Sequence, residues 1–491
     1  MAYLMGIDLG TSSVKTLIVD QNGYSISCAA ESYNMDVPQI GFAEQDCESL
    51  WKATVLSIQH ACSQAGANKK EIKSIGLSGQ MHGLVILDKD KRPIRPIIIW
   101  ADQRTKKQVD YLKTLHCEEN IRNPMNTGFF LPSLLWVKEN EPDYFAQIQY
   151  MLLPKDYIRY RLCGEMGTDF SDASGTLLFN QLTQDWDELL IKKLEIKKES
   201  LPSCHKSYET AGYLQGGPAD MAGLRKGIPV AFGGGDGPMQ LIGNGAVTPG
   251  KVVTNIGTAS QVDVICDFPY YDKKTRVNVF HHAVENRWIT MAASLNGGII
   301  LNWLKNNIFT DITSYDEMDS CAERTGPGCN GLVFLPYLCG ERFPHMDPDA
   351  KGILYGLTIS HNRDHIIRAC MESTVYAFKE GIEVFEQLGI PVGDTIIAAG
   401  GGTRSPLWLQ IQADILQRQI ITIQNTEAAC IGAAIAGGVC CGVYQDVYEG
   451  CEIAVHASEK ITIPNADTWP VYLENYQKYH MLYENNKNLL G

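Results

Sequence analysis

The chain lacks three features that would assign it to a specialised class of protein. No two of its 15 cysteines have the C-x-x-C spacing of metal and redox motifs. The most apolar stretch, "IGAAIAGGVCCGVY", is too short and too rich in glycine to cross a bilayer. The net charge of −14 excludes a protein that coats nucleic acid. We therefore expect reduced, mostly buried thiols, no membrane or nucleic-acid partner, and a cytoplasmic location.

Length and composition indicate a globular protein with more than one core. A chain of 491 residues exceeds the usual size of a single domain. Its 45 glycines are neither periodic nor confined to one tract, which excludes fibrous and low-complexity proteins. The acidic balance does not exclude a nucleotide, because glycine amides and a few cations can form a local anion site.

Two similar segments, "GIDLGTSSVKTLIVD" and "VVTNIGTASQVDVICD", each predict a strand, a tight turn and a second strand. Aligning Gly10 with Gly257 pairs Asp8 with Asn255, and the two glycines are 247 residues apart. This spacing is about half the chain and favours duplication of one domain. Glycine and proline in "IGNGAVTPGK" mark the boundary, which predicts domains of residues 1–246 and 247–491.

The first turn, Gly10-Thr11-Ser12-Ser13, has the composition of a phosphate-binding turn. Backbone N–H groups of such a turn can form a concave anion site, with Lys15 adding a cation. Asp8 precedes the turn and could hold Mg²⁺, which prefers carboxylate and phosphate oxygen. The alternative is a plain hairpin in which Asp8 accepts turn hydrogen bonds. The second Gly-Thr, at Gly257-Thr258, favours the phosphate site.

Two further glycine turns each follow a predicted strand and precede a predicted helix. Gly401 and Gly402, in "AAGGGTRSP", could let adenine or ribose lie against the backbone, or could simply allow close helix packing. Neither this turn nor "GGGDGPMQ" contains G-x-G-x-x-G, so a dinucleotide-binding fold is excluded. The stretch "IIRACMESTVYAFKEGIEVFEQLG" has the apolar spacing of a long packed helix.

Asp236, in "FGGGDGPMQ", is the candidate general base, because a carboxylate on a rigid, accessible turn can receive a hydroxyl proton. The alternative is an N-cap aspartate of the following helix. In "GQMHG", His82 could bind a sugar hydroxyl, with Met81 and Trp100 against the carbon skeleton, although a lone histidine is more often structural.

Asp102 and Arg104, in "IIIWADQRT", form a second ambiguous pair. They could make a structural ion pair or reach the pocket, and the sequence leaves both open.

Seven segments together resemble the FGGY family of carbohydrate kinases, most closely its xylulose kinase branch. They are "GIDLGTSSVKTLIVD", "GLSGQMHGLVILD", "RPIIIWADQRT", "LLPKDYIRYRLCGEMGTDFSDASGTLLFN", "FGGGDG", "FLPYLCGERFPHMDPDAKGILYGLT" and "AAGGGTRSPLWLQIQADIL". They occur in the family's order from the first strand to about Tyr444.

The resemblance implies an α/β fold of two duplicated ribonuclease-H-like domains, of the actin and hexokinase ATPase type, flanking a central cleft. It implies ATP-dependent phosphorylation of D-xylulose to D-xylulose 5-phosphate, with ATP as co-substrate, Mg²⁺ as cofactor, and a homodimer. Asp236 then matches the base and Asp8 the metal-associated carboxylate. Met81 and His82 match the sugar-binding dipeptide. The positions that match ATP contacts are Gly10, Thr11, Ser12, Gly257, Thr258, Gly298, Gly401 and Gly402.

Three departures bear on the substrate. Gly237 stands where the family commonly has Asn or Gln in contact with the sugar. Gly-Thr-Ala-Ser replaces Gly-Thr-Ser-Gly at the second turn, and Ser133 replaces a lysine of the first family signature. A missing sugar contact could admit another ketose, a polyol or a sugar acid such as ribulose or gluconate. A non-catalytic, actin-like nucleotide switch is the alternative of another class, and the retained Asp8 and Asp236 argue against it.

Overall fold

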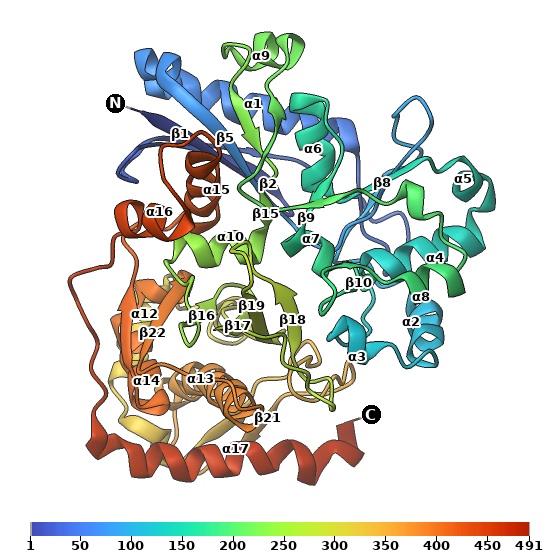
Figure 1. The fold of residues 1–491 in the computed structure, drawn as a ribbon. Helices are drawn as coiled ribbons and strands as arrows, with labels where there is room; N and C mark the ends of the chain where they lie inside the picture. The colour runs from blue at the N-terminus through green and yellow to red at the C-terminus, as the bar shows by residue number, and fades with distance from the viewer. Residues whose placement is uncertain (1, 491) are drawn as a thin grey trace.

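Two β-sheets organise the chain in the computed structural model, which describes residues 2–490 (Figure 1). The first sheet has the order β13-β14-β5-β1-β2-β3, with β15 also paired to β5. Its strands are β1 (Tyr3–Leu9), β2 (Ser13–Asp20), β3 (Ser25–Ser32), β5 (Ile72–Gly79), β13 (Thr210–Tyr213), β14 (Pro229–Ala231) and β15 (Gly234–Gly235). The second sheet has the order β18-β19-β17-β16-β22-β23. Its strands are β16 (Val252–Ile256), β17 (Ser260–Cys266), β18 (Asn278–His281), β19 (Trp288–Ser294), β22 (Thr395–Gly400) and β23 (Gln419–Thr422).

The two sheets share one topology. In the first, β1, β2 and β3 form an antiparallel meander, and β1 continues through parallel β5 to parallel β14. In the second, β16, β17 and β19 form the meander, and β16 continues through parallel β22 to parallel β23. The predicted duplication of an α/β unit is therefore confirmed.

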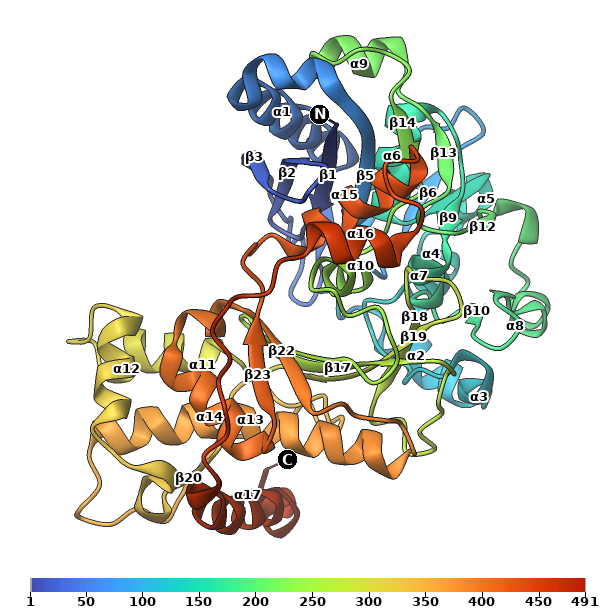
Figure 2. The ribbon, with the colours of Figure 1, turned by 60° about the vertical axis from the view of Figure 1, so that its left-hand side comes forward.

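The helices surround both sheets, and a side lobe extends from the first sheet (Figures 1 and 2). Those before the second sheet are α1 (Cys47–Ala65), α2 (Lys106–Lys113), α3 (Glu118–Ile121), α4 (Phe130–Asn140), α5 (Pro142–Gln147), α6 (Pro154–Cys163), α7 (Phe170–Ser174), α8 (Glu188–Lys193), α9 (Gly216–Ala222) and α10 (Asp236–Gly243). The later ones are α11 (Ile299–Trp303), α12 (Tyr315–Glu323), α13 (Arg363–Gln387), α14 (Pro406–Leu416), α15 (Ala428–Cys440), α16 (Val447–Ala454) and α17 (Trp469–Leu490).

Short strand pairs complete the side lobe and loops. They are β4 (Glu44–Gln45) with β7 (Ile97–Ile98), β6 (Val85–Leu87) with β8 (Tyr150–Leu152), β9 (Thr168–Asp169) with β12 (Cys204–His205), β10 (Phe179–Asn180) with β11 (Asp185–Trp186), and β20 (Val333–Leu335) with β21 (Ile353–Tyr355).

Helix α15 returns from the second half of the chain to pack on the first sheet, beside β1 and β5 (Figures 1 and 2). Glycines make this close approach possible. A Cβ at Gly6 of β1 would lie 1.9 Å from the Cys430 carbonyl oxygen, and one at Gly76 of β5 would lie 1.7 Å from that of Ala433. The small residues of "IGAAIAGG" therefore serve helix–strand packing. The division into residues 1–246 and 247–491 stays a prediction. Helices α15 and α16 come from the second half of the chain but lie against the first sheet and its helix α10.

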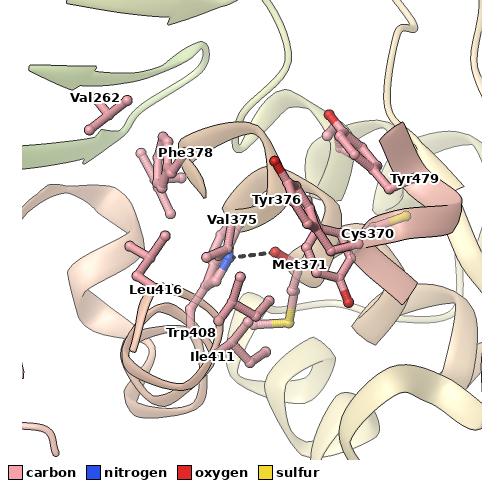
Figure 3. Close-up of a cluster of buried hydrophobic side chains, with 14 of the residues drawn as sticks. Val262, Cys370, Met371, Val375, Tyr376, Phe378, Trp408, Ile411, Leu416 and Tyr479 are labelled. Carbon is pink, nitrogen blue, oxygen red and sulfur yellow. Dashed lines mark hydrogen bonds between the residues drawn. The ribbon is translucent and has the colours of Figure 1, made fainter. Parts of the chain in front are cut away.

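The core formed by the second sheet and its helices lies between α13, α14 and α17 (Figure 3). Trp408 of α14 is 5% exposed, and its indole Nε1 donates a hydrogen bond of 3.0 Å to the carbonyl oxygen of Met371 in α13. Burial of such large side chains supplies the main stabilisation of this part of the fold. Trp408 also lines the cavity described next, so this core supports its wall.

The state of the cysteines and the length of the helices bear on two expectations from composition. Within residues 2–490 none of the 15 cysteines is in a disulfide bond, and most of them are buried, as predicted. Within residues 2–490, none of the helices combines the length and the apolar character that a membrane crossing requires.

Candidate active site

Two cavities meet at the hairpin turn between β16 and β17. The first, of about 470 Å³, is lined by the predicted sugar-site residues Met81, His82, Trp100 and Asp236 and by Asp8, the predicted metal-associated carboxylate. The second, of about 560 Å³, is lined by the predicted nucleotide-site residues Gly257, Thr258, Gly298, Gly401 and Gly402. Ala259 and Ser260, the next residues of the turn, line the first cavity. The fold thus brings these residues together, with one turn between them, whereas Gly10, Thr11 and Ser12, also predicted to contact ATP, line neither cavity.

Asp236 is the first residue of α10, which follows directly on β15. The N-cap is Gly235, so the interpretation of Asp236 as an N-cap is wrong: the helix begins one residue earlier than that interpretation requires. Burial and the nearby charge of Asp8 raise the pKa of Asp236 to about 7, although backbone N–H groups oppose this, including a 2.9 Å bond from Gly237. A carboxylate with a pKa near neutrality suits a general base.

Asp8 lies near the end of β1 and faces the same cavity. Its carboxylate accepts a 2.7 Å hydrogen bond from Ser78 Oγ, and burial raises its pKa despite this bond and the charge of Lys15. Within residues 2–490, no group of three or more His, Cys, Asp or Glu side chains could enclose a metal ion. A lone carboxylate fits Mg²⁺, which is commonly held by one or two carboxylates together with substrate phosphates.

In the Gly10–Ser13 turn, residues outside the turn donate hydrogen bonds to the carbonyl oxygens, whereas two N–H groups are left available. The carbonyl oxygens of Gly10, Thr11 and Ser12 accept hydrogen bonds from Tyr33 Oη, Gln45 Nε2 and Tyr33 N respectively. In the described part of the chain, the N–H groups of Thr11 and Ser12 have no hydrogen-bond acceptor. Adjacent free amides of this kind form an anion-binding site.

The second turn repeats this arrangement. The carbonyl oxygen of Gly257 accepts a 2.8 Å bond from Gly298 N, and that of Thr258 accepts a 3.1 Å bond from Ile299 N. The N–H groups of Thr258 and Ala259 have no acceptor among the described residues. A Cβ at Gly298 would lie 2.7 Å from the Gly257 oxygen, so only glycine fits without displacing this turn.

His82 combines a structural hydrogen bond with a place on the cavity wall. Its Nδ1 lies 2.7 Å from the Gly175 carbonyl oxygen, and its ring stacks on Phe129 with centroids 3.9 Å apart. Burial lowers its pKa to about 4, so the ring is neutral at pH 7. A neutral ring that donates from Nδ1 to this carbonyl presents Nε2 as an acceptor for a hydroxyl.

Three charged residues have protein partners. Asp102 and Arg104 form a buried ion pair of 2.7 Å and line neither cavity, which decides in favour of the structural alternative. Lys15, predicted to bind phosphate, lies 2.7 Å from the Glu427 carboxylate and also lines neither cavity. Its contact with phosphate stays a prediction.

Several cavity residues were not identified from the sequence, because they lie on loops, strands and helices where their residue type alone does not indicate a site. In the first cavity these are Asn126, Phe129, Gln240, Gln261, Asn278, Phe280, Met291 and Arg342; in the second they include Asn302, Lys305, Tyr315 and Asp319. Asn255 also lines the first cavity. It could have been identified from the sequence, because it aligns with Asp8 in the duplication.

Comparison with known proteins identifies the family. The model of the N-terminal domain of the FGGY family of carbohydrate kinases matches residues 3–243, and that of the C-terminal domain matches residues 256–441. The chain belongs to the FGGY family. It is therefore a carbohydrate kinase, and the family implies ATP as its co-substrate.

Individual FGGY proteins resemble the whole chain. It is 34% identical to a xylulose kinase of Bacillus subtilis, in an alignment that covers 100% of this chain and 97% of the relative. The structure of a ligand-bound xylulose kinase from Lactobacillus acidophilus matches with a TM-score of 0.94 and 27% identity, covering 100% of this chain and 99% of that one. A gluconate kinase from the same organism matches with a TM-score of 0.93 and 26% identity, covering 99% and 98%. The fold is thus common to kinases named for different substrates.

Proposed function

We propose that the chain transfers the γ-phosphoryl group of ATP to the C5 hydroxyl of D-xylulose, with Asp236 as the general base. The observation that carries the proposal is the place of Asp236: it is half-buried at the start of α10, shares a cavity with Asp8 and His82, and has a pKa near 7. The similarity to xylulose kinases along the full chain supports this choice of sugar.

In the proposed reaction, the sugar hydroxyl lies against the Asp236 carboxylate. Its proton passes to that carboxylate as the oxygen bonds to phosphorus, and the bond from phosphorus to the β,γ-bridging oxygen breaks, releasing ADP. The free amides of Thr11, Ser12, Thr258 and Ala259 would hold phosphate oxygens from the two sides of the cleft. Mg²⁺ bound through Asp8 would supply charge compensation for the phosphates.

The first cavity offers both apolar and polar surface to a sugar. Met81 and Phe280 would cover the carbon skeleton, while His82, Asn126 and Asn278 would contact hydroxyls. Such a mixture of apolar walls and a few directed polar groups is typical of small-molecule sites.

Phosphorylation of a sugar acid is the second candidate, and Arg342 favours it. This guanidinium lines the sugar cavity, and burial lowers its pKa. Among the residues the structure describes it forms no ion pair, and the charge of Glu341 only partly opposes the effect of burial on its pKa. Desolvated cations usually have an anionic partner, which a carboxylate on the substrate would provide. Gly237 leaves additional room, because a Cβ there would meet only Met291 Cε, at 3.9 Å.

The test is a coupled ADP-release assay with Mg-ATP against D-xylulose, D-ribulose, L-ribulose, L-xylulose, glycerol and gluconate, with a no-sugar control. The highest kcat/KM for D-xylulose supports the proposal, whereas dominant turnover of gluconate supports the second candidate. Binding of ATP without ADP release for any sugar would instead indicate a nucleotide-dependent switch.

A further inference from the structure

A cluster of buried charged side chains lies beneath the segment that carries Asp236. Its members are Lys155, Asp156 and Arg159 of α6, and Asp169 and Asp172 at the start of α7; each is 0% exposed. Lys155 Nζ lies 2.6 Å from Asp156 Oδ1, 3.2 Å from Asp169 Oδ1 and 3.5 Å from Asp172 Oδ2. Arg159 lies 3.6 Å from Asp156.

The cluster is connected to Asp236 through a short series of hydrogen bonds. Asp169 Oδ2 accepts from Ser171 N at 2.9 Å and from Ser171 Oγ at 2.5 Å. Ser171 Oγ in turn accepts a 3.1 Å bond from Gly235 N, the residue immediately before Asp236. Lys155 Nζ also donates a 3.3 Å bond to the carbonyl oxygen of Phe232, three residues before Gly235. The cluster therefore fixes the backbone at both ends of the 232–235 segment.

Packing alone does not account for so many buried charges. Desolvation of ions is costly, and replacing a buried ionic group by apolar side chains of similar volume is often neutral or stabilising. The ionic cluster provides directed hydrogen bonds to specific backbone atoms, which an apolar cluster could not provide. Those atoms belong to the segment that enters α10 at Asp236.

We propose that Lys155, Asp169 and Ser171 are positioning residues that hold the Asp236 carboxylate in its reactive orientation. The inference rests on the proposed role of Asp236 as base. A displacement of about 1 Å at a reacting group can cost on the order of a hundredfold in rate, so the loss of one anchoring bond should appear in kcat.

Two variants of serines bonded to the same carboxylate oxygen separate positioning from simple support of the cluster. Ser171→Ala removes the hydroxyl to which Gly235 N donates, and Ser207→Ala removes a 2.8 Å bond to Asp169 Oδ2 without touching Gly235. We expect Ser171→Ala to lower kcat about tenfold to thirtyfold, with KM for ATP and the stoichiometry of ATP binding changed less than about twofold. We expect Ser207→Ala to retain kcat within about threefold.

The inference is overturned if Ser171→Ala retains kcat within threefold, or if Ser207→Ala loses as much. A parallel fall in kcat and in ATP stoichiometry also overturns it, because that pattern reports loss of folded protein. Should Ser171→Ala not fold, Ser171→Cys keeps nearly the same volume with a weak acceptor, and the same limits on kcat apply. Asp236→Asn is measured alongside: if it retains turnover, the proposed base is wrong, whatever the serine variants do.

Discussion

The carboxylates of Asp8 and Asp236 line the same cavity, and the negative charge of Asp8 raises the pKa of Asp236. The two groups come from different elements, one from β1 and the other from the start of α10. Burial has the larger effect on the pKa of Asp236, and the charge of Asp8 adds to it. In the proposed mechanism, Asp236 is thereby adjusted for proton transfer, and Asp8 would hold a hard cation.

This relationship predicts the pH dependence of the reaction. A base works only when deprotonated, so activity is lost as the pH falls through the raised pKa of about 7. We expect kcat/KM for the sugar to fall about tenfold per pH unit below this value. In the Asp8→Asn variant the remaining activity should show this limb at lower pH, because the repelling charge is gone. An unshifted limb in that variant would contradict the assigned coupling.

The stability of an Asp236→Asn variant follows from the same pKa. The pKa of Asp236 is raised from its ordinary value of 3.8, so its ionised form destabilises the folded state above pH 7. We expect the neutral amide to raise Tm by roughly 1 to 3 °C at pH 8, with a smaller gain as the pH falls toward 4. Calorimetry of both proteins measures this, and a lower Tm at pH 8 would indicate that the carboxylate stabilises the fold.

Gly298 provides a test of the second phosphate turn. A Cβ there would lie 2.7 Å from the Gly257 oxygen, so Gly298→Ala should displace the turn and raise KM for ATP about tenfold. KM for the sugar should change less than about twofold. Gly216→Ala is the matched control, because no atom lies within 4 Å of its added Cβ. Equal effects on both KM values would mean that Gly298 supports the fold as a whole.

Gly237 should accept a side chain. Its added Cβ would contact only Met291 Cε, at 3.9 Å, so Gly237→Asn should fold normally. We expect the new amide to lower KM for D-xylulose about threefold to tenfold, because it adds a hydrogen bond of ordinary strength. Initial rates across a range of xylulose concentrations measure this. A raised KM would show that the open space itself is needed by the substrate.

Arg342 distinguishes the two candidate substrates. Replacing it by Met removes a half-buried cation that forms no ion pair in the described part of the chain, and keeps an apolar stem of similar length. If the substrate is a sugar acid, kcat/KM should fall about a hundredfold or more, since a charge-assisted hydrogen bond is lost. With D-xylulose the fall should be about tenfold or less, as for a hydrogen bond between a cation and a neutral hydroxyl.

The local parts of the fold were predictable because their signals are contiguous in the sequence. The hairpins after Asp8 and Asn255, the glycine turns before α10 and α14, and the long helix α13 all occur where the patterns place them. The return of α15 to the first sheet was not predictable, because it depends on glycines in β1 and β5 that meet a helix more than 350 residues away.

The site residues were predictable where an acidic side chain or a Gly-Thr pair lies at a turn that the sequence indicates. Asp8, Asp236 and the second Gly-Thr turn line the cavities, and Thr11 of the first turn accepts a 2.8 Å bond from Trp100, which lines the first cavity. Asn126 and Asn278 lie in segments without a motif, and Arg342 lies in a family segment in which nothing distinguishes it as a site residue. The ion pair of Lys15 with Glu427 joins residues 412 positions apart, so no local pattern reveals it.

The central claim is that Asp236 accepts the proton of the attacking sugar hydroxyl. The most direct measurement is single-turnover phosphorylation of D-xylulose with Mg-ATP by the unmodified protein and by Asp236→Asn, with ATP affinity measured on both. We predict that the variant transfers phosphoryl groups roughly 10² to 10⁴ times more slowly while its ATP affinity changes less than about threefold. Transfer by Asp236→Asn at the unmodified rate would contradict the account.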